Sequence, residues 1–251
     1  MKNLTKYFIL IWAVTMIPNL YAEENKVRVE LPIQNQTFVY KQNIRLDQLI
    51  STVWTNSPSN APLILPLGFQ LFDKNKNAEA LELKQKVIER LQYVQKSDDT
   101  LAQSAQLLQQ QIQHWDVGYR LNISLDYDLV RLFTKNNPVM DGDFELITPI
   151  RKESVFIEGL LFKPHSAPLS STKPLHDYLS DAYLLSSAHQ SYVWVIYPDG
   201  KYKRVGYAAW NEESINLTPN TSIFIGMDSD TPAWSELEED IVKLITMRKA
   251  Q

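Results

Sequence analysis

The sequence predicts an α+β protein with two small sheet domains, a helical hairpin inserted in the first, and a C-terminal amphipathic helix. Alternating apolar residues such as Val27, Val29 and Leu31 recur in both halves and are typical of strands. The stretch at about 77–115 has helical spacing instead. Between residues 137 and 162, two alternating segments flank Pro149, which predicts a junction between two domains.

The first 22 residues have the features of a secretory signal peptide. Lys2 and Lys6 precede an apolar run from Tyr7 to Ile17, and the small residue Ala22 marks the expected cut. The run is shorter than the roughly 20 residues that span a bilayer. An uncleaved anchor is the alternative, because Leu20 occupies a position where a smaller residue is usual. We expect a secreted, periplasmic protein.

Charge and composition restrict the function further. The formal net charge is -4, and it becomes -6 once Lys2 and Lys6 are removed. Such a chain is a poor partner for nucleic acid. The absence of cysteine excludes disulfides and thiolate metal sites, so stability must come from buried apolar cores.

The first domain is expected over residues 23–150. The strands of its opening hairpin are expected at Val27–Leu31 and at Phe38–Tyr40, followed by a short helix at Leu46–Val53. Strands are also expected at Tyr119–Ser124 and Leu129–Phe133, with Asp126 to Asp128 as the turn between them, and the closing strand at Asp143–Ile147.

The predicted insertion is a pair of antiparallel helices, with Ser97, Asp98 and Asp99 as turn and capping residues. The helices should pack on each other and on the sheet, and a coiled-coil dimerisation arm is the alternative. Their expected apolar stripes are Ala78, Leu81, Ile88, Leu91 and Val94 in the first helix, and Leu101, Ala105, Leu108, Ile112 and Trp115 in the second.

The second domain, expected over residues 151–228, repeats the plan of the first. A strand at Val155–Phe162 is followed by a short helix near Pro174–Leu179, a hairpin turning at Pro198-Asp199-Gly200, and a closing strand that ends at Ile225. Two strands, a helix and two more strands in one sheet is the β-grasp plan. The order of elements therefore predicts two β-grasp domains.

The last segment, residues 229–251, should be an amphipathic helix. Thr231 is placed as the N-cap and Pro232 at the first helical position. Acidic residues come first and Lys243, Arg248 and Lys249 come last, as the helix dipole favours. The apolar stripe consists of Trp234, Leu237, Ile241, Leu244 and Ile245.

No catalytic motif is present. The chain lacks GxSxG, HExxH and a Gly-rich phosphate loop, and its four histidines do not have metal-ligand spacing. The pairs Asp141/Asp143 and Asp228/Asp230 resemble catalytic or metal-binding carboxylates, but both lie in turns where Asp is expected. The sequence therefore predicts no catalytic residue, no metal and no cofactor.

Two features indicate binding. The second domain is rich in Tyr and Trp, which suit glycan or protein surfaces because they join a flat apolar body to a polar edge. Arg120 follows Gly118-Tyr119 where the insertion re-enters the sheet, and its guanidinium there would suit a carboxylate ligand; an internal salt bridge is the alternative.

Four segments resemble the capsule-biosynthesis GfcC family, in the same order along the chain. They are DVGYRLNISLDYDLVRL, NPVMDGDFELI, VWVIYPDGKYKRVGYAAWN and PNTSIFIGM. The resemblance implies a periplasmic protein with two β-grasp domains similar to those of Wza-type outer-membrane polysaccharide exporters. It also implies a C-terminal helix like the exporter's barrel helix. Arg120 matches the family's Gly-x-Arg position, with Tyr119 as the intervening residue.

These observations favour a non-enzymatic accessory of capsule or exopolysaccharide assembly that binds polysaccharide or the exporter as a monomer or weak oligomer. The expected binding residues are Arg120, Tyr119, Trp234, Leu237 and Ile241. The C-terminal helix is expected either to pack on its own domain or to present its stripe to an exporter or a membrane surface. The rivals are a polysaccharide-modifying enzyme, with Arg120 holding an acidic sugar, and a purely structural partner of an exporter ring.

Overall fold

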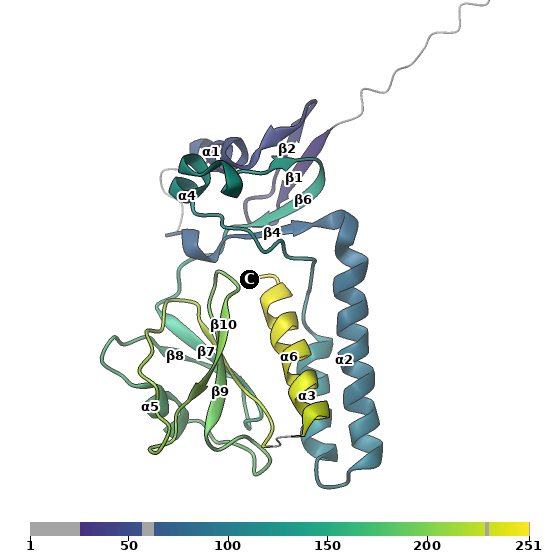
Figure 1. Cartoon of the computed structure of the whole chain (residues 1–251), viewed down its shortest axis with the longest axis vertical. Coiled ribbons are helices and arrows are strands. Elements are labelled where there is room, and N and C mark those ends of the chain that lie inside the picture. Colours follow the sequence, from purple (N-terminus) through teal and green to yellow (C-terminus); the bar gives the residue numbers. More distant parts are fainter. Residues whose placement is uncertain (1–25, 57–62, 229–230, 251) are drawn as a thin grey trace, which may run out of the picture.

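The computed structural model describes residues 26–56, 63–228 and 231–250, and it is a mixed α+β structure (Figure 1). The expected signal peptide lies outside these residues. None of the helices in the described ranges is long and apolar enough to cross a membrane.

The first half contains a four-stranded sheet in the order β2-β1-β6-β4. β1 pairs antiparallel with β2 and parallel with β6, while β4 pairs antiparallel with β6. The strands are β1 Val27–Leu31, β2 Gln36–Tyr40, β4 Gln70–Asp73 and β6 Gly142–Ile147. A separate pair joins β3 (Ile44–Arg45) to β5 (Val139–Met140). The predicted opening hairpin and closing strand are confirmed.

The core of this sheet follows from the alternation of its strands. Val27, Val29 and Leu31 of β1 are buried, whereas Arg28 is exposed. They pack against helix α1, Leu46–Asn56, which buries Leu49 and its neighbours. The apolar period of two on the strand and the helical stripe therefore meet in one cluster.

The strand expected at Leu129–Phe133 is wrong, because this segment forms helix α4, Tyr127–Leu132. The Asp126 carboxylate accepts hydrogen bonds from the backbone N–H groups of Asp128 and Leu129, at 2.9 and 3.1 Å. The residues interpreted as a turn are thus the N-cap of a helix. The strand expected at Tyr119–Ser124 is an irregular segment, which makes two backbone hydrogen bonds to β4.

The second half contains a five-stranded sheet in the order β10-β9-β11-β7-β8. β7 runs parallel to β11, and the other neighbours pair antiparallel. The elements are β7 Ser154–Gly159, β8 His165–Pro168, α5 Leu175–Ser180, β9 Tyr192–Ile196, β10 Tyr202–Gly206 and β11 Ser222–Ile225. Gly200 adopts a φ of 87° in the Pro-Asp-Gly turn, as predicted for the β9–β10 hairpin.

The helical hairpin consists of α2, Asn77–Ser97, and α3, Ala102–Gln113. Its expected second stripe is largely confirmed, because Ala105, Leu108 and Ile112 are buried. The first stripe is only partly right: α2 buries Ala80, Val87 and Leu91, whereas Ala78 and Leu81 are exposed. The difference arises because α2 packs on both α3 and the C-terminal helix α6, which turns a different face inward.

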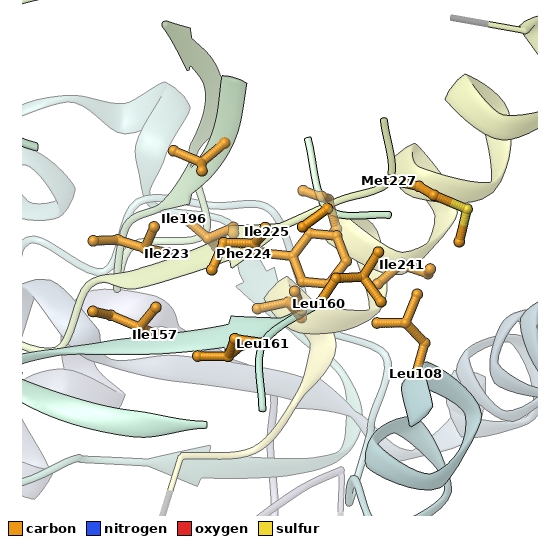
Figure 2. Packing of buried hydrophobic residues seen from close by; sticks show 14 of the residues in the cluster. Leu108, Ile157, Leu160, Leu161, Ile196, Ile223, Phe224, Ile225, Met227 and Ile241 are labelled. Carbon is orange, nitrogen blue, oxygen red and sulfur yellow. The ribbon is translucent and has the colours of Figure 1, made fainter. Parts of the chain in front are cut away.

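The hairpin belongs to the core of the second half. Helix α6, Pro232–Met247, lies between the hairpin and the second sheet (Figure 1). Figure 2 shows Leu108 of α3 and Ile241 of α6 pointing toward the same cluster as Leu160 and Phe224. A segment inserted after β4 therefore helps to cover the other sheet.

Candidate functional site

A cleft of about 480 Å³ lies where the two halves meet. Its walls come from the end of α3, strands β7 and β8, the β9–β10 turn, and the last residues of the chain. The C-terminus lies between the two sheets (Figure 1). The cleft therefore brings together segments that are far apart in the sequence.

Arg120 reaches this cleft, and its guanidinium bonds to three backbone carbonyls. Its Nη2 donates to the oxygens of Pro198 and Phe69, at 2.7 and 3.3 Å, and its Nη1 donates to Thr246 at 3.2 Å. These acceptors belong to the β9–β10 turn, the first half and the last turn of α6. Arg120 thus links three segments and satisfies a carbonyl that the helix end leaves open.

The environment of Arg120 differs from the internal salt bridge that was one of the two sequence-based alternatives. Within the described ranges no carboxylate lies within 4 Å of the guanidinium, so the suggested internal salt bridge is absent. Burial lowers the pKa of the Arg120 guanidinium to about 10, and the charge of Asp199 opposes this shift. The residue carries a buried charge that is satisfied by neutral oxygens.

The C-terminal tail, residues 248–250, forms another wall of the cleft. The Arg248 guanidinium donates to both carboxylate oxygens of Glu158, at 2.6 and 2.8 Å. It lies 4.9 Å from the centre of the Trp115 ring. Lys249 Nζ lies 2.7 Å from a carboxylate oxygen of Glu145 on the first sheet. The tail therefore contacts both sheets through charged side chains.

Backbone contacts hold the tail in place. The N–H of Gly118 donates to the Met247 carbonyl at 3.0 Å, and the N–H of Lys249 donates to the backbone carbonyl of Asp116 at 2.9 Å. The side-chain amide of Gln70 bonds to the Arg248 carbonyl and to the Ala250 N–H, at 3.1 and 2.8 Å. Helix α6 ends at Met247 with Arg248 as its C-cap, so Arg248 and Lys249 lie at the helix C-terminus as expected, while their side chains pair with Glu158 and Glu145.

The two carboxylates in the cleft wall are those of Asp116 and Glu158. Both oxygens of Glu158 accept hydrogen bonds from Arg248. The Asp116 side chain is 67% exposed and lies 3.7 Å from Lys249. Neither carboxylate is therefore placed as a general acid, which needs a protonated oxygen directed at the substrate.

The remaining predicted binding residues lie away from this cleft. Tyr119 does not line the cleft, and its ring lies against Lys76, whose Nζ is 5.1 Å from the ring centre. Trp234 and Leu237 line a second groove of about 570 Å³ between α2 and α6. Ile241 is only 1% exposed and lies in the core. The structure thus brings Arg120 alone, of the five, to the cleft.

Sequence reasoning missed Arg248, Lys249 and Trp115 as residues of the cleft. The basic pair follows the last apolar residue of the helical stripe, which is also where a helix dipole favours cations. The acids on the strands, Glu145 and Glu158, are the signal that could have placed Arg248 and Lys249 in the cleft. Both acids are buried, and buried carboxylates need cationic partners.

Helix α6 carries another buried acid, Glu238, on the side that faces the second sheet. It accepts hydrogen bonds from Trp194 Nε1 at 3.1 Å and from the Met227 N–H at 2.6 Å. Burial raises the pKa of the Glu238 carboxyl, against the opposing effect of these two donors. The carboxylate thus joins α6 to β9 and to the segment after β11.

The fold and the cleft define an α+β protein in which two mixed sheets are joined through the C-terminal tail. Residues 23–150 match the family described as "Capsule biosynthesis GfcC, N-terminal", and residues 163–250 match "Capsule biosynthesis GfcC C-terminal". The chain belongs to the capsule biosynthesis GfcC family, as the resemblance predicted.

A relative in Escherichia coli (strain K12) carries the name "Uncharacterized protein YjbG" and is 36% identical over 159 residues. The aligned part is 62% of this chain and 63% of the relative. The chain thus matches less than two thirds of that relative's length.

Proposed function

We propose that this chain is a periplasmic accessory protein of capsule or exopolysaccharide assembly that binds polysaccharide, or the outer-membrane exporter, through the cleft between its sheets. Membership of the capsule biosynthesis GfcC family supports a role in this process. The proposal places the signal peptide at residues 1–22, the two domains at 23–150 and 151–228, and the terminal helix at 229–251.

The cleft is the observation that carries the proposal. Four cationic side chains contribute to its wall, Arg120, Lys152, Arg248 and Lys249, against the two carboxylates of Asp116 and Glu158. Arg248 is paired with Glu158 and Lys249 with Glu145, so Arg120 and Lys152 against Asp116 leave a surplus of one positive charge. This balance favours an anionic ligand, and an acidic sugar is the anionic group that a capsule-assembly protein would meet.

The strand order supports two β-grasp domains within this proposal. In each sheet the first strand forms a hairpin with the second and pairs in parallel with the last, while a helix follows the hairpin. The second sheet differs by one further strand, β10, at its edge. The strand order that the two sheets share supports the proposal of two β-grasp domains.

The contacts of Glu158 favour a binding protein over the rival enzyme. A retaining or inverting glycosidase needs two carboxyl groups that act as acid and as nucleophile or base. In the cleft, one of the two candidates is held by a bidentate ion pair and the other is exposed beside Lys249.

The proposal also includes what helix α6 packs against. Leu237 and Ile241 are buried against the chain itself, which supports packing on its own domain. Docking to an exporter or a membrane surface would have to use Trp234 and the second groove, or release the helix.

Closing the cleft tests the proposed function directly. Ser166 on β8 contributes to the wall and is exposed, so Ser166→Trp should fill the cleft without removing a buried contact. Cells that lack the gene should be complemented with each variant, and surface polysaccharide should be measured separately in the cell-bound and released fractions. Thr37→Trp on β2, exposed and outside the cleft, is the matched control.

We expect gene deletion and Ser166→Trp to reduce cell-bound polysaccharide, and Thr37→Trp to restore it. A normal polysaccharide level after gene deletion contradicts the role in capsule assembly. A normal level with Ser166→Trp, in a protein shown to be folded, contradicts the cleft as the site. A periplasmic fraction without the protein contradicts the location.

A further inference from the structure

A row of aromatic side chains follows the outer edge of the second sheet. This aromatic row consists of Tyr192 and Trp194 on β9, Tyr202 on β10, and Trp210 in the turn after β10. Ring centres of Trp194 and Tyr202 are 5.9 Å apart, and those of Tyr192 and Trp210 are 6.3 Å apart. The cross-strand pairs place Arg204 opposite Trp194, on the same face.

The ends of the row are open to solvent. Trp210 is 73% exposed and Tyr202 is 39% exposed. Arg204 is exposed and its guanidinium carbon lies 4.5 Å from the centre of the Tyr192 ring. The cations next to it in sequence, Lys201 and Lys203, have acidic partners, whereas no ion pair of Arg204 occurs in the described ranges.

The turn that carries Trp210 is held by several hydrogen bonds. The Asn211 side chain accepts from the Ala208 N–H at 3.0 Å and donates to the Ser191 carbonyl at 3.1 Å. Asn211 also packs against Gly206, where any side chain would collide with it. Trp210 is therefore presented on an ordered turn, and its exposure is not a matter of a loose loop.

We propose that the aromatic row and Arg204 form a second glycan surface, separate from the cleft, which binds an acidic polysaccharide lying along the β9–β10 hairpin. The exposed rings of Trp210 and Tyr202 offer flat apolar faces for the C–H faces of sugar rings. Arg204 supplies a bidentate donor for a sugar carboxylate.

The charge of Arg204 selects the ligand class. Arg204 is an exposed guanidinium stacked on the Tyr192 ring, and the buried Glu238 carboxyl offsets only part of its charge, at a distance longer than an ion pair. Such a group is complementary to an anionic chain and offers nothing extra to a neutral one. The inference rests on the proposed function for taking a polysaccharide as the ligand. It concerns residues outside the cleft and is tested by a separate binding measurement.

Binding of purified full-length protein to defined polysaccharides tests this surface. The probes are alginate, a uronate polymer, and dextran, a neutral glucan, in affinity electrophoresis and calorimetry. We expect alginate to bind and dextran not to bind. Trp210→Ala and Arg204→Ala should each weaken alginate binding about ten-fold, and Arg204→Lys should lose part of the affinity. Tyr183→Ala, which removes an 81% exposed aromatic outside the row, is the control.

The inference is overturned by no binding to alginate, by equal binding to dextran, or by equal losses from Tyr183→Ala and Trp210→Ala. A change in sedimentation of the free protein with Trp210→Ala would identify the row as a protein interface and also overturn it. If alginate binding depends on Trp210 while gene deletion leaves surface polysaccharide intact, this inference stands and the proposed function fails. If gene deletion reduces surface polysaccharide while Trp210→Ala binds alginate normally, the proposed function stands and this inference fails.

Discussion

Arg248 and Glu158 form a bidentate ion pair between the tail and strand β7 of the second sheet, across 90 positions of sequence. Glu158 is only 2% exposed, so its charge depends on this partner. We expect Arg248→Ala to lower the free energy of unfolding by about 3 to 5 kcal/mol, because it leaves a buried carboxylate unpaired. Urea denaturation measures this change.

The matched control for this ion pair is Lys203→Ala. Lys203 pairs with Glu213 at 2.5 Å, but both side chains are well exposed. Water and salt screen such an exposed pair, so Lys203→Ala should change the free energy of unfolding far less than Arg248→Ala. Equal effects of the Arg248 and Lys203 variants would show that the tail does not hold Glu158 in solution.

Arg120→Ala should also destabilise the protein, because three backbone carbonyls lose their donor. We expect a loss of about 3 kcal/mol, since hydrogen bonds to charged groups contribute about 1.5 to 3 kcal/mol and buried unsatisfied acceptors add a cost. Arg120→Lys should recover part of it, because an ammonium can reach fewer of the three oxygens. Thermal and urea unfolding check this, and an unchanged midpoint for Arg120→Ala would contradict the linking role.

The buried Glu238 carboxyl predicts a pH-dependent contribution to stability. Its folded-state pKa is raised above the reference value of 4.5, so its contribution is present below that value and is lost as pH rises through the folded-state pKa. Glu238→Gln removes the titration and adds a pH-independent offset. The stability of the natural protein minus that of the variant should therefore fall as the pH rises above 4.5 and through the folded-state pKa. Urea titrations at several pH values measure it; a flat difference would contradict the shift.

Helix α6 should be required for folding. Truncation after Asp230 removes five buried apolar side chains, Leu237, Ile241, Val242, Leu244 and Ile245. Each is worth about 1.5 to 3 kcal/mol, so the loss is comparable to the 5 to 15 kcal/mol of a typical domain. We expect an insoluble or unfolded product, judged by expression and circular dichroism. A soluble, folded product would instead support a helix that can leave its own domain.

A single substitution gives a graded version of this test. Leu244 is fully buried, and Leu244→Ala should cost about 2 to 5 kcal/mol. Lys243→Ala, at the exposed neighbouring position, should change stability by about 0.5 kcal/mol or less. Similar values for the two would mean that α6 is not packed in solution as described.

Local sequence signals predicted most of the elements. The Pro198-Asp199-Gly200 turn, the alternation of β1 and the spacing of α3 each depend on neighbouring residues only, and the structure has them where they were expected. Helix α4 was missed because Asp126 can serve either as a turn residue or as an N-cap, and a segment of six residues is too short for its period to decide.

The site was harder to predict because it depends on partners far apart in sequence. An apolar stripe predicts that a helix has a buried face but not which other element covers it. Because α2 also packs on α6, its buried face does not include Leu81. Arg120 was placed at the junction from its position beside the insertion. The carbonyls of Phe69, Pro198 and Thr246 that receive its hydrogen bonds carry no side-chain signal at all.

The packing of the α2–α3 hairpin on the second half sets the order in which the chain can fold. Lys86 on α2 and Asp240 on α6 form an ion pair across 154 positions, so the hairpin is synthesised long before its partner helix exists. Until residue 245 is available, the apolar faces of Val87 and Leu108 have no complete cover. Contacts of such long range slow folding. A piece that begins at residue 151 would keep α6 but lack α2 and α3, which complete the same core, whereas a piece that begins near residue 77 would retain all three helices.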